Sequence, residues 1–109
     1  METGNKDKKI GVAVYEALGT AFIMYALMVN VGSYLSSAAV VTFACMCIAW
    51  NVSGAHFNPA ITIGVYISEK NFGGNALMAG IMILAQFGGA FLGLIFGYLA
   101  LISKDYMQD

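Results

Sequence analysis

Three long apolar runs, at residues 10–32, 35–52 and 76–102, constrain this chain more than any other feature of its sequence. Each is close to or above the roughly 20 residues that a helix needs to cross a hydrocarbon core about 30 Å thick. Of the 109 residues, 60% are hydrophobic and only 10% are charged, whereas about 25% are charged in a typical soluble domain. We therefore expect an all-α membrane protein with three transmembrane helices.

The same runs set the expected domain limits. Residues 1–9 form a polar amino-terminal tail, residues 10–102 form one membrane domain, and residues 103–109 form a second polar tail. Lysines precede the first run, as they precede the apolar core of a secretory signal. Its length of about 23 residues exceeds the roughly 7–15 of such a core. The first run is therefore predicted to be a retained span.

Charge and side-chain chemistry exclude several classes of function. A net charge of −1 does not suit nucleic acid, whose phosphates need a basic patch. The sequence contains no visible nucleophile–base pair, metal-ligand cluster or phosphate-binding loop, so we expect neither an enzyme nor a cofactor. Cys45 and Cys47 lie inside an apolar run and are interpreted as small buried hydrophobic residues. Gly89, Gly93 and Gly97 share one helix face and predict close helix packing rather than a binding site.

A fourth apolar segment, residues 59–67, is too short to cross a membrane. Its nine residues make about 13 Å of helix, and the helix-breaking residues 53–59 precede it. Irregular backbone cannot face lipid, because its N–H and C=O groups would lack partners. The segment therefore either lies at the membrane surface or dips in and returns, surrounded by protein, as part of a pore. Residues 68–75, which include Gly73-Gly74, are predicted to form a loop.

The short segment opens with Asn58-Pro59-Ala60, a favourable start for a helix. Asn is among the best N-caps, and Pro at the first helical position lacks an N–H that would be unpaired anyway. The amino end of such a helix carries about half a positive charge, which opposes cations and protons. The Asn58 amide offers donors to a passing oxygen, and the carbonyls before it offer a ladder of acceptors. These carbonyls belong to Gly54, Ala55, His56 and Phe57.

Residues 51–62, Asn-Val-Ser-Gly-Ala-His-Phe-Asn-Pro-Ala-Ile-Thr, resemble the first signature loop of the aquaporin and glycerol-facilitator family. Two more motifs resemble those of the family, in its order and at about its spacing. They are Glu16-Ala17-Leu18-Gly19-Thr20 in the first run and Ala85-Gln86-Phe87-Gly88-Gly89-Ala90 in the last. The resemblance covers residues 10–102 and implies half of a six-span channel built as two inverted repeats. It also implies water or a small neutral solute such as glycerol as the permeant, a second half-channel as partner, and assembly into a tetramer.

The chain departs from the family pattern at three places. Trp50-Asn51 stands where the family usually has Gly-His, and Phe57 stands where Leu is common. Twenty residues before Asn58, the family usually has an aromatic residue that narrows the outer filter, and this chain has Ala38 there. That last departure weakens the expectation of a filter that passes water alone.

Three polar residues have alternative interpretations. Glu16 is costly inside a span unless its carboxylate is satisfied. It either binds a proton or a cation, or it accepts hydrogen bonds from the buried loop, and the resemblance favours bracing of the loop. Gln86 has the same two interpretations, and its amide can both donate and accept. His56, the single histidine, acts either as a pH gate or as an anchor of the loop, and the second is favoured.

The lysines predict how the chain lies in the membrane. Cytoplasmic loops carry an excess of lysine and arginine, and this chain has five lysines and no arginine. Three spans would place four lysines on one side and one on the other: Lys6, Lys8, Lys9 and Lys70 against Lys104. We therefore expect a multi-pass protein of the lipid bilayer with a cytoplasmic amino terminus, and a short segment that enters from the cytoplasmic side.

Two alternatives to a half-channel stay open. Small multidrug exporters are about as long and resemble this chain in a first-span Glu followed by Gly-Thr. Such a transporter would use Glu16 to exchange protons for cations, but its four-span subunit has no place for the Asn-Pro-Ala segment. The other alternative is a non-conducting membrane remnant.

Overall fold

The structure is a computed structural model that describes residues 5–29 and 35–108. Regular structure in these residues is α-helical and comprises α1 (Lys6–Val29), α2 (Leu35–Ser53), α3 (Pro59–Glu69) and α4 (Phe72–Gln108). Among the described helices, α1 and α4 are long and apolar enough to cross a membrane, and α2 contributes a shorter apolar stretch, Ser37–Ser53. The expectation of an all-α protein is confirmed.

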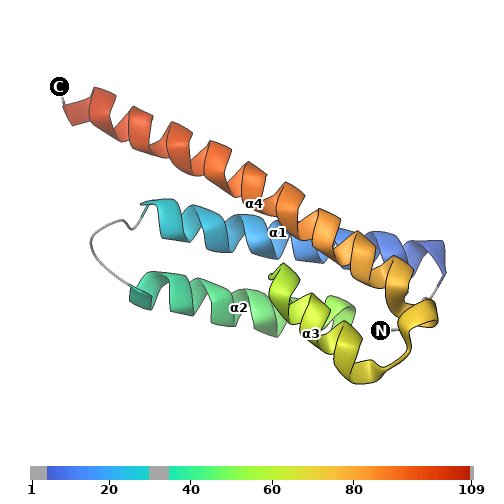
Figure 1. The fold of residues 1–109 in the computed structure, drawn as a ribbon. Helices are drawn as coiled ribbons and strands as arrows, with labels where there is room; N and C mark the ends of the chain where they lie inside the picture. Colours follow the sequence, from blue (N-terminus) through green and yellow to red (C-terminus); the bar gives the residue numbers. More distant parts are fainter. Residues whose placement is uncertain (1–4, 30–34, 109) are drawn as a thin grey trace.

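The helix α1 lies at the centre of an elongated molecule of about 56 × 24 × 20 Å. It packs against both α2 and α4, whereas α3 packs against α4. Figure 1 shows α1 and α4 running in the same general direction, with α2 running back beside α1. The short helix α3 begins about midway along the molecule and runs towards the end that holds the amino terminus (Figure 1). Its amino end therefore lies in the middle of the molecule.

The helix α1 begins at Lys6, earlier than the predicted start at residue 10, because Asn5 caps it. The Asn5 Oδ1 accepts from the Lys8 N–H at 3.1 Å, and the Asn5 carbonyl accepts from the Lys9 N–H at 3.3 Å. Such a cap satisfies N–H groups that the start of a helix leaves unpaired. Residues 30–32 of the predicted first span lie outside the described residues.

The loop predicted at 68–75 is wrong, because only Lys70 and Asn71 separate α3 from α4. Lys70 ends α3 in the left-handed region, with φ 55° and ψ 17°. Asn71 then caps α4, since its Oδ1 accepts from the Gly74 N–H at 3.3 Å. The Gly73-Gly74 pair that indicated a loop lies in the first turn of α4 instead.

The helix α4 also passes its predicted end at residue 102 and continues to Gln108. Residues 103–108 contain neither glycine nor proline, so their polarity does not stop the helix. The 37 residues of α4 correspond to about 55 Å of helix, which exceeds the roughly 30 Å of a bilayer core. The polar tail predicted at 103–109 is therefore helical over its described part.

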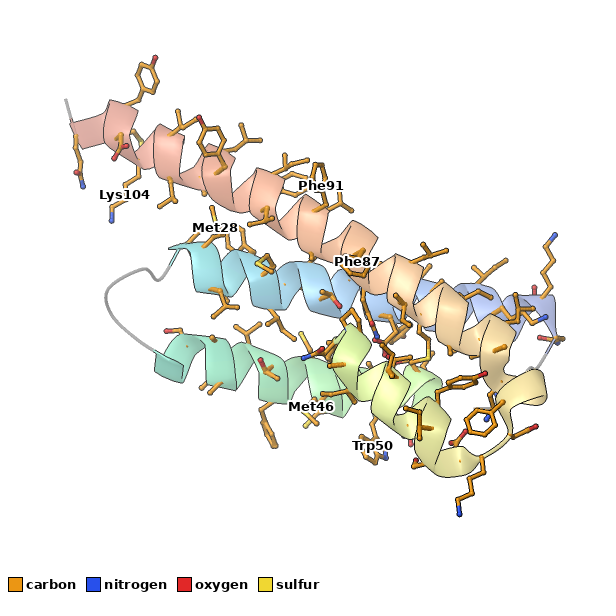
Figure 2. The ribbon with its side chains drawn as sticks, in the orientation of Figure 1. Met28, Met46, Trp50, Phe87, Phe91 and Lys104 are labelled. Carbon is orange, nitrogen blue, oxygen red and sulfur yellow. The ribbon has the colours of Figure 1, made fainter. Side chains whose placement is uncertain are left out.

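Three glycines pack α4 closely against α1. Gly89, Gly93 and Gly97 are all buried, and a Cβ added to any of them would overlap or crowd α1. The atoms in the way are the carbonyl groups of Ala17 and Ala21 and the Cβ of Met24 and Met28. Figure 2 shows Met28 on α1 facing α4. The close packing predicted from the glycine spacing is confirmed.

Candidate functional site

The segment between α2 and α3, residues 54–58, has a strained backbone. Ala55 and Phe57 have positive φ angles of 54° and 52°, and Gly54 has a φ of 83°. Glycine adopts such angles readily, whereas other residues held in sparsely populated regions cost on the order of 1–3 kcal/mol each. Two such residues within three positions persist only if contacts from outside the segment hold them.

Glu16 of α1 supplies those contacts. Its exposed fraction is 0%, and its carboxylate accepts four hydrogen bonds. Oε1 accepts from the Ser53 hydroxyl at 2.6 Å and from the His56 N–H at 3.0 Å. Oε2 accepts from the Phe57 N–H at 2.7 Å and from Gln86 Nε2 at 2.9 Å. With two donors on each oxygen, the carboxylate is satisfied, and the structure brings Glu16, Gln86 and the loop together.

Thr62 extends this network into the first turn of α3. It is also 0% exposed. Its Oγ1 lies 2.8 Å from Gln86 Nε2, 2.9 Å from His56 Nδ1 and 3.4 Å from the Asn58 carbonyl oxygen. A single hydroxyl therefore links α4, the loop and the start of α3.

The same hydrogen bonds determine which way the loop carbonyls point. The N–H groups of residues 55–57 donate to the Ser53 hydroxyl and to Glu16. A trans peptide places the C=O of one residue opposite the N–H of the next, and none of the described peptide bonds is cis. The carbonyls of residues 54–56 are therefore turned away from the Glu16 network. The direction of the Phe57 carbonyl is not fixed in this way, because Glu16 does not accept from the N–H of Asn58.

Asn58 caps α3 and is exposed. Its backbone is extended, with φ −153° and ψ 123°, and its Oδ1 accepts from the Ala60 N–H at 2.9 Å. Pro59 occupies the first helical position. Because the cap uses the oxygen of the Asn58 amide, the Nδ2 hydrogens remain as donors. They lie where α3 begins, near the middle of the molecule (Figure 1).

Phe57 secures the apolar edge of the loop. It is 8% exposed and belongs to a small apolar cluster with Ala49 and Ala55. A Cβ added at Gly19 would overlap the Phe57 ring, so the ring uses the space that the missing side chain leaves. The loop is thus held by hydrogen bonds at one edge and by an aromatic ring at the other.

Two residues singled out in the sequence lie apart from this network. Ala38 is buried in the first half of α2, with 9% of its surface exposed, and its carbonyl accepts from the Thr42 hydroxyl at 2.7 Å. Trp50 is 62% exposed and lies on the outer side of α2 (Figure 2). Neither side chain bonds to the loop among the described residues. The filter position of Ala38 stays a prediction.

Sequence reasoning missed two members of the network, Ser53 and Thr62. Ser53 is the last residue of α2 before the helix-breaking Gly54, and Thr62 is a polar residue within the apolar segment 59–67. Both positions carried a signal, since a hydroxyl beside irregular backbone can satisfy an N–H or a carbonyl. Within residues 5–29 and 35–108, no group of three His, Cys, Asp or Glu side chains is placed to hold a metal ion.

Comparison with known proteins identifies the family. The model of the major intrinsic protein family matches residues 9–108, which is nearly the whole chain. No match was found among curated proteins or among solved structures. The matched region contains the loop, the Glu16 network and all but the first residues of α1. The chain therefore belongs to the major intrinsic protein family, whose members are membrane channels for water or small solutes rather than enzymes.

Proposed function

We propose that this chain forms one half of a passive channel for water or a small neutral solute such as glycerol. In this proposal α1, α2 and α4 cross the bilayer. The loop of residues 54–58 lies within the bilayer, and α3 leads from it back to the side on which α4 begins. Family membership supports a channel. The observation that carries the proposal is the direction of the loop carbonyls, which face away from Glu16 because their neighbouring N–H groups are held there.

A neutral solute that moves along the loop would meet acceptors first and donors next. The carbonyls of residues 54–56 accept its hydroxyl hydrogens, and the Asn58 Nδ2 group donates to its oxygen. These bonds replace the ones that the solute makes in bulk water. The amino end of α3 adds about half a positive charge at the same place. It repels cations, and a water that accepts from Asn58 turns its hydrogens away, which interrupts a path for protons.

The bonding of Glu16 argues against the exporter alternative. An acid that exchanges protons for cations must release its partners to take up its cargo, whereas Glu16 is buried and accepts four hydrogen bonds. Release would leave two backbone N–H groups unpaired, at a cost of about 1–3 kcal/mol each. In our proposal Glu16 and Gln86 brace the loop and take no part in transport.

We further propose that a second half-channel, with its own Asn-Pro-Ala segment and an arginine, completes the pore. Asn58 and three isoleucines of α3 are exposed on this chain, so the side of α3 away from α4 has room for a partner. The isoleucines are Ile61, Ile63 and Ile67. By family resemblance the complete pores would assemble as tetramers, and Ala38 would leave the outer filter wide enough for solutes larger than water.

Replacement of Asn58 by aspartate tests this function. Asp is as good an N-cap as Asn, so Asn58→Asp keeps the helix start and exchanges the donors for a negative charge. In proteoliposomes that also hold the second half, we expect water flux to fall about two- to tenfold, the equivalent of one hydrogen bond, and a cation leak to appear. Asn51→Asp, at an exposed asparagine of α2, is the matched control and should change neither. Unchanged flux and no leak in Asn58→Asp would contradict the proposal.

A further inference from the structure

The Thr62 hydroxyl is surrounded by more polar groups than it can serve as a donor. Gln86 Nε2, His56 Nδ1 and the Asn58 carbonyl oxygen lie 2.8, 2.9 and 3.4 Å from its oxygen. A threonine hydroxyl has one hydrogen and two lone pairs. A neighbour that is known to be a donor occupies one lone pair, which leaves the hydrogen and the second lone pair for the other two neighbours.

Glu16 identifies that donor. The Gln86 amide group that faces Thr62 also lies 2.9 Å from Glu16 Oε2, and a carboxylate that takes four hydrogen bonds can only accept. An amide oxygen at that distance would be repelled, so the NH2 group of Gln86 must face both residues. The orientation leaves the buried Gln86 Oε1 without a hydrogen-bond partner among the described residues. It also makes Thr62 Oγ1 an acceptor from Gln86.

The Thr62 hydrogen then has two possible acceptors. The Asn58 carbonyl oxygen is 3.4 Å away and already accepts from the Thr62 N–H at 3.1 Å. His56 Nδ1 is 2.9 Å away, which is within the usual range for such a bond, whereas 3.4 Å is beyond it. A ring with its hydrogen on Nδ1 would keep the 2.9 Å contact by donating to Thr62 Oγ1, but the buried hydroxyl hydrogen would then have only the long bond to the Asn58 carbonyl. Donation from the hydroxyl to Nδ1 gives that hydrogen a bond of normal length, and we assign this direction. A neutral imidazole carries its hydrogen on only one nitrogen, so the hydrogen of His56 is on Nε2.

We propose that Thr62 is a positioning residue that holds neutral His56 in its Nε2–H tautomer, so that His56 presents a fixed donor next to Gly54, at the start of the loop. The Nε2 atom lies next to Gly54, 3.4 Å from the position of an added Cβ. In the other tautomer Nε2 would be an acceptor and not a donor. The assignment of the tautomer is independent of channel activity, whereas the role of the donor towards a passing solute rests on the proposed function.

The single histidine of the chain makes the tautomer directly measurable. Nitrogen-15 NMR on the histidine-labelled chain in lipid bilayers, under alkaline conditions where histidine is neutral, should show one species with Nε2 protonated and Nδ1 accepting a hydrogen bond. Thr62→Val should remove that bond and give a mixture of tautomers, and Thr62→Ser should restore the single species. Thr42→Val is the matched control, because the Thr42 hydroxyl donates to the Ala38 carbonyl of its own helix.

The outcomes separate the two parts of the proposal. An Nδ1–H tautomer in the unmodified chain, or an unchanged spectrum in Thr62→Val, overturns the positioning role, and the first result needs no variant to fold. With the second half present, Thr62→Val should lower water flux about two- to tenfold relative to Thr62→Ser, the equivalent of one hydrogen bond. Equal flux would overturn the donor role and leave the tautomer standing. Absence of flux in the unmodified pair would overturn the proposed channel alone.

Discussion

A carboxylate inside an apolar helix is costly unless its lone pairs find donors, and Glu16 finds them in three places. Two donors are backbone N–H groups of the strained loop, one is the Ser53 hydroxyl, and one is the Gln86 amide. The same hydrogen bonds therefore offset both the cost of burying the acid and the strain of the loop. Without the loop the carboxylate would lose two of its four donors, and without the carboxylate the N–H groups of His56 and Phe57 would lose their acceptor.

Replacement of Glu16 by glutamine should destabilise the fold, even though the shape of the side chain is kept. The new NH2 group must face either the His56 N–H or the Phe57 N–H, because each oxygen of Glu16 accepts from one of them. Ser53 can turn its hydroxyl and Gln86 can flip its amide, so that either one accepts from the new NH2 group. A backbone N–H can only donate and cannot adapt in this way. We expect Glu16→Gln to lose about 1–3 kcal/mol, measured by thermal unfolding in detergent. Glu69→Gln is the control: this exposed acid accepts from Asn75 Nδ2 at 2.6 Å, a bond that a glutamine oxygen can keep. It should lose less stability, and equal losses in the two variants would contradict the role of Glu16.

The sequence pointed to Glu16, Gln86 and His56 because polar side chains are rare in apolar segments. It could not separate the bracing hydroxyls from ordinary ones. A threonine hydroxyl within a helix can donate to the backbone carbonyl four residues earlier, as Thr20 does to the Glu16 carbonyl oxygen at 2.7 Å. Thr62 has the same sequence context, but its hydroxyl lies 3.4 Å from the carbonyl four residues earlier and is closer to Gln86 and His56. Thr62 differs from Thr20 because Gln86 of α4 lies beside it. The local sequence around Thr62 does not predict that contact between helices.

At the scale of helices, hydropathy predicted which segments are helical, but it did not predict where α1 begins or where α4 begins and ends. Their ends depend on caps, and a cap is one side chain in one conformation. Asn71 starts α4 despite two following glycines, and Asn5 starts α1 within a stretch of charged residues. The sequence closely predicted the end of α2, at residue 52 against Ser53. It also predicted the start of α3, because Asn58-Pro59 combines a preferred cap with a preferred first residue.

Two adjacent glycines of α4 offer a matched test of its packing. A Cβ at Gly89 would overlap the Ala17 carbonyl, whereas a Cβ at Gly88 meets nothing within 4 Å. Gly89→Ala should push α4 away from α1 and cost about 1–3 kcal/mol, as overpacking does. Gly88→Ala should be neutral or stabilising by up to about 1 kcal/mol, because alanine favours a helix over glycine. Thermal unfolding of the two variants measures both effects, and equal stability would show that the α1–α4 contact is looser than described.

At the scale of the whole molecule, the sequence could not predict which helices are neighbours. In a soluble bundle each helix shows its buried face as an apolar stripe, but in lipid both faces are apolar and the stripe disappears. Here the central place of α1, between α2 and α4, follows from features that hydropathy does not weigh. They are the glycines of α4 that allow it to approach α1 closely, and the carboxylate of Glu16 that accepts hydrogen bonds from the loop.

The orientation of the molecule gives a prediction at this scale. If α1, α2 and α4 all cross the bilayer, the amino and carboxyl termini lie on opposite sides, and the lysines place the amino terminus in the cytoplasm. Figure 1 places the amino terminus and the α3–α4 turn at one end of the molecule and the carboxyl terminus at the other. Terminal tags tested for protease access in sealed vesicles should be cleaved at one end only. Cleavage or protection of both tags together would contradict the three-span arrangement.

The last prediction is that this chain alone does not conduct water. A pore needs walls on all sides, and inverted-repeat transporters form their sites where two halves meet. One half leaves Asn58 and the carbonyls of residues 54–56 facing lipid or a partner, and each unpaired backbone group in lipid costs several kcal/mol.

A second copy would have to insert upside down to supply the opposite wall, and the bias of four lysines against one opposes that. The expected partner is a separate half with its own Asn-Pro-Ala segment and an arginine. Light scattering from shrinking proteoliposomes, with and without that half, measures the outcome. We expect background permeability from the chain alone and fast flux from the pair. Fast flux from the purified 109-residue chain would contradict the prediction and would indicate a dimer of opposite topologies.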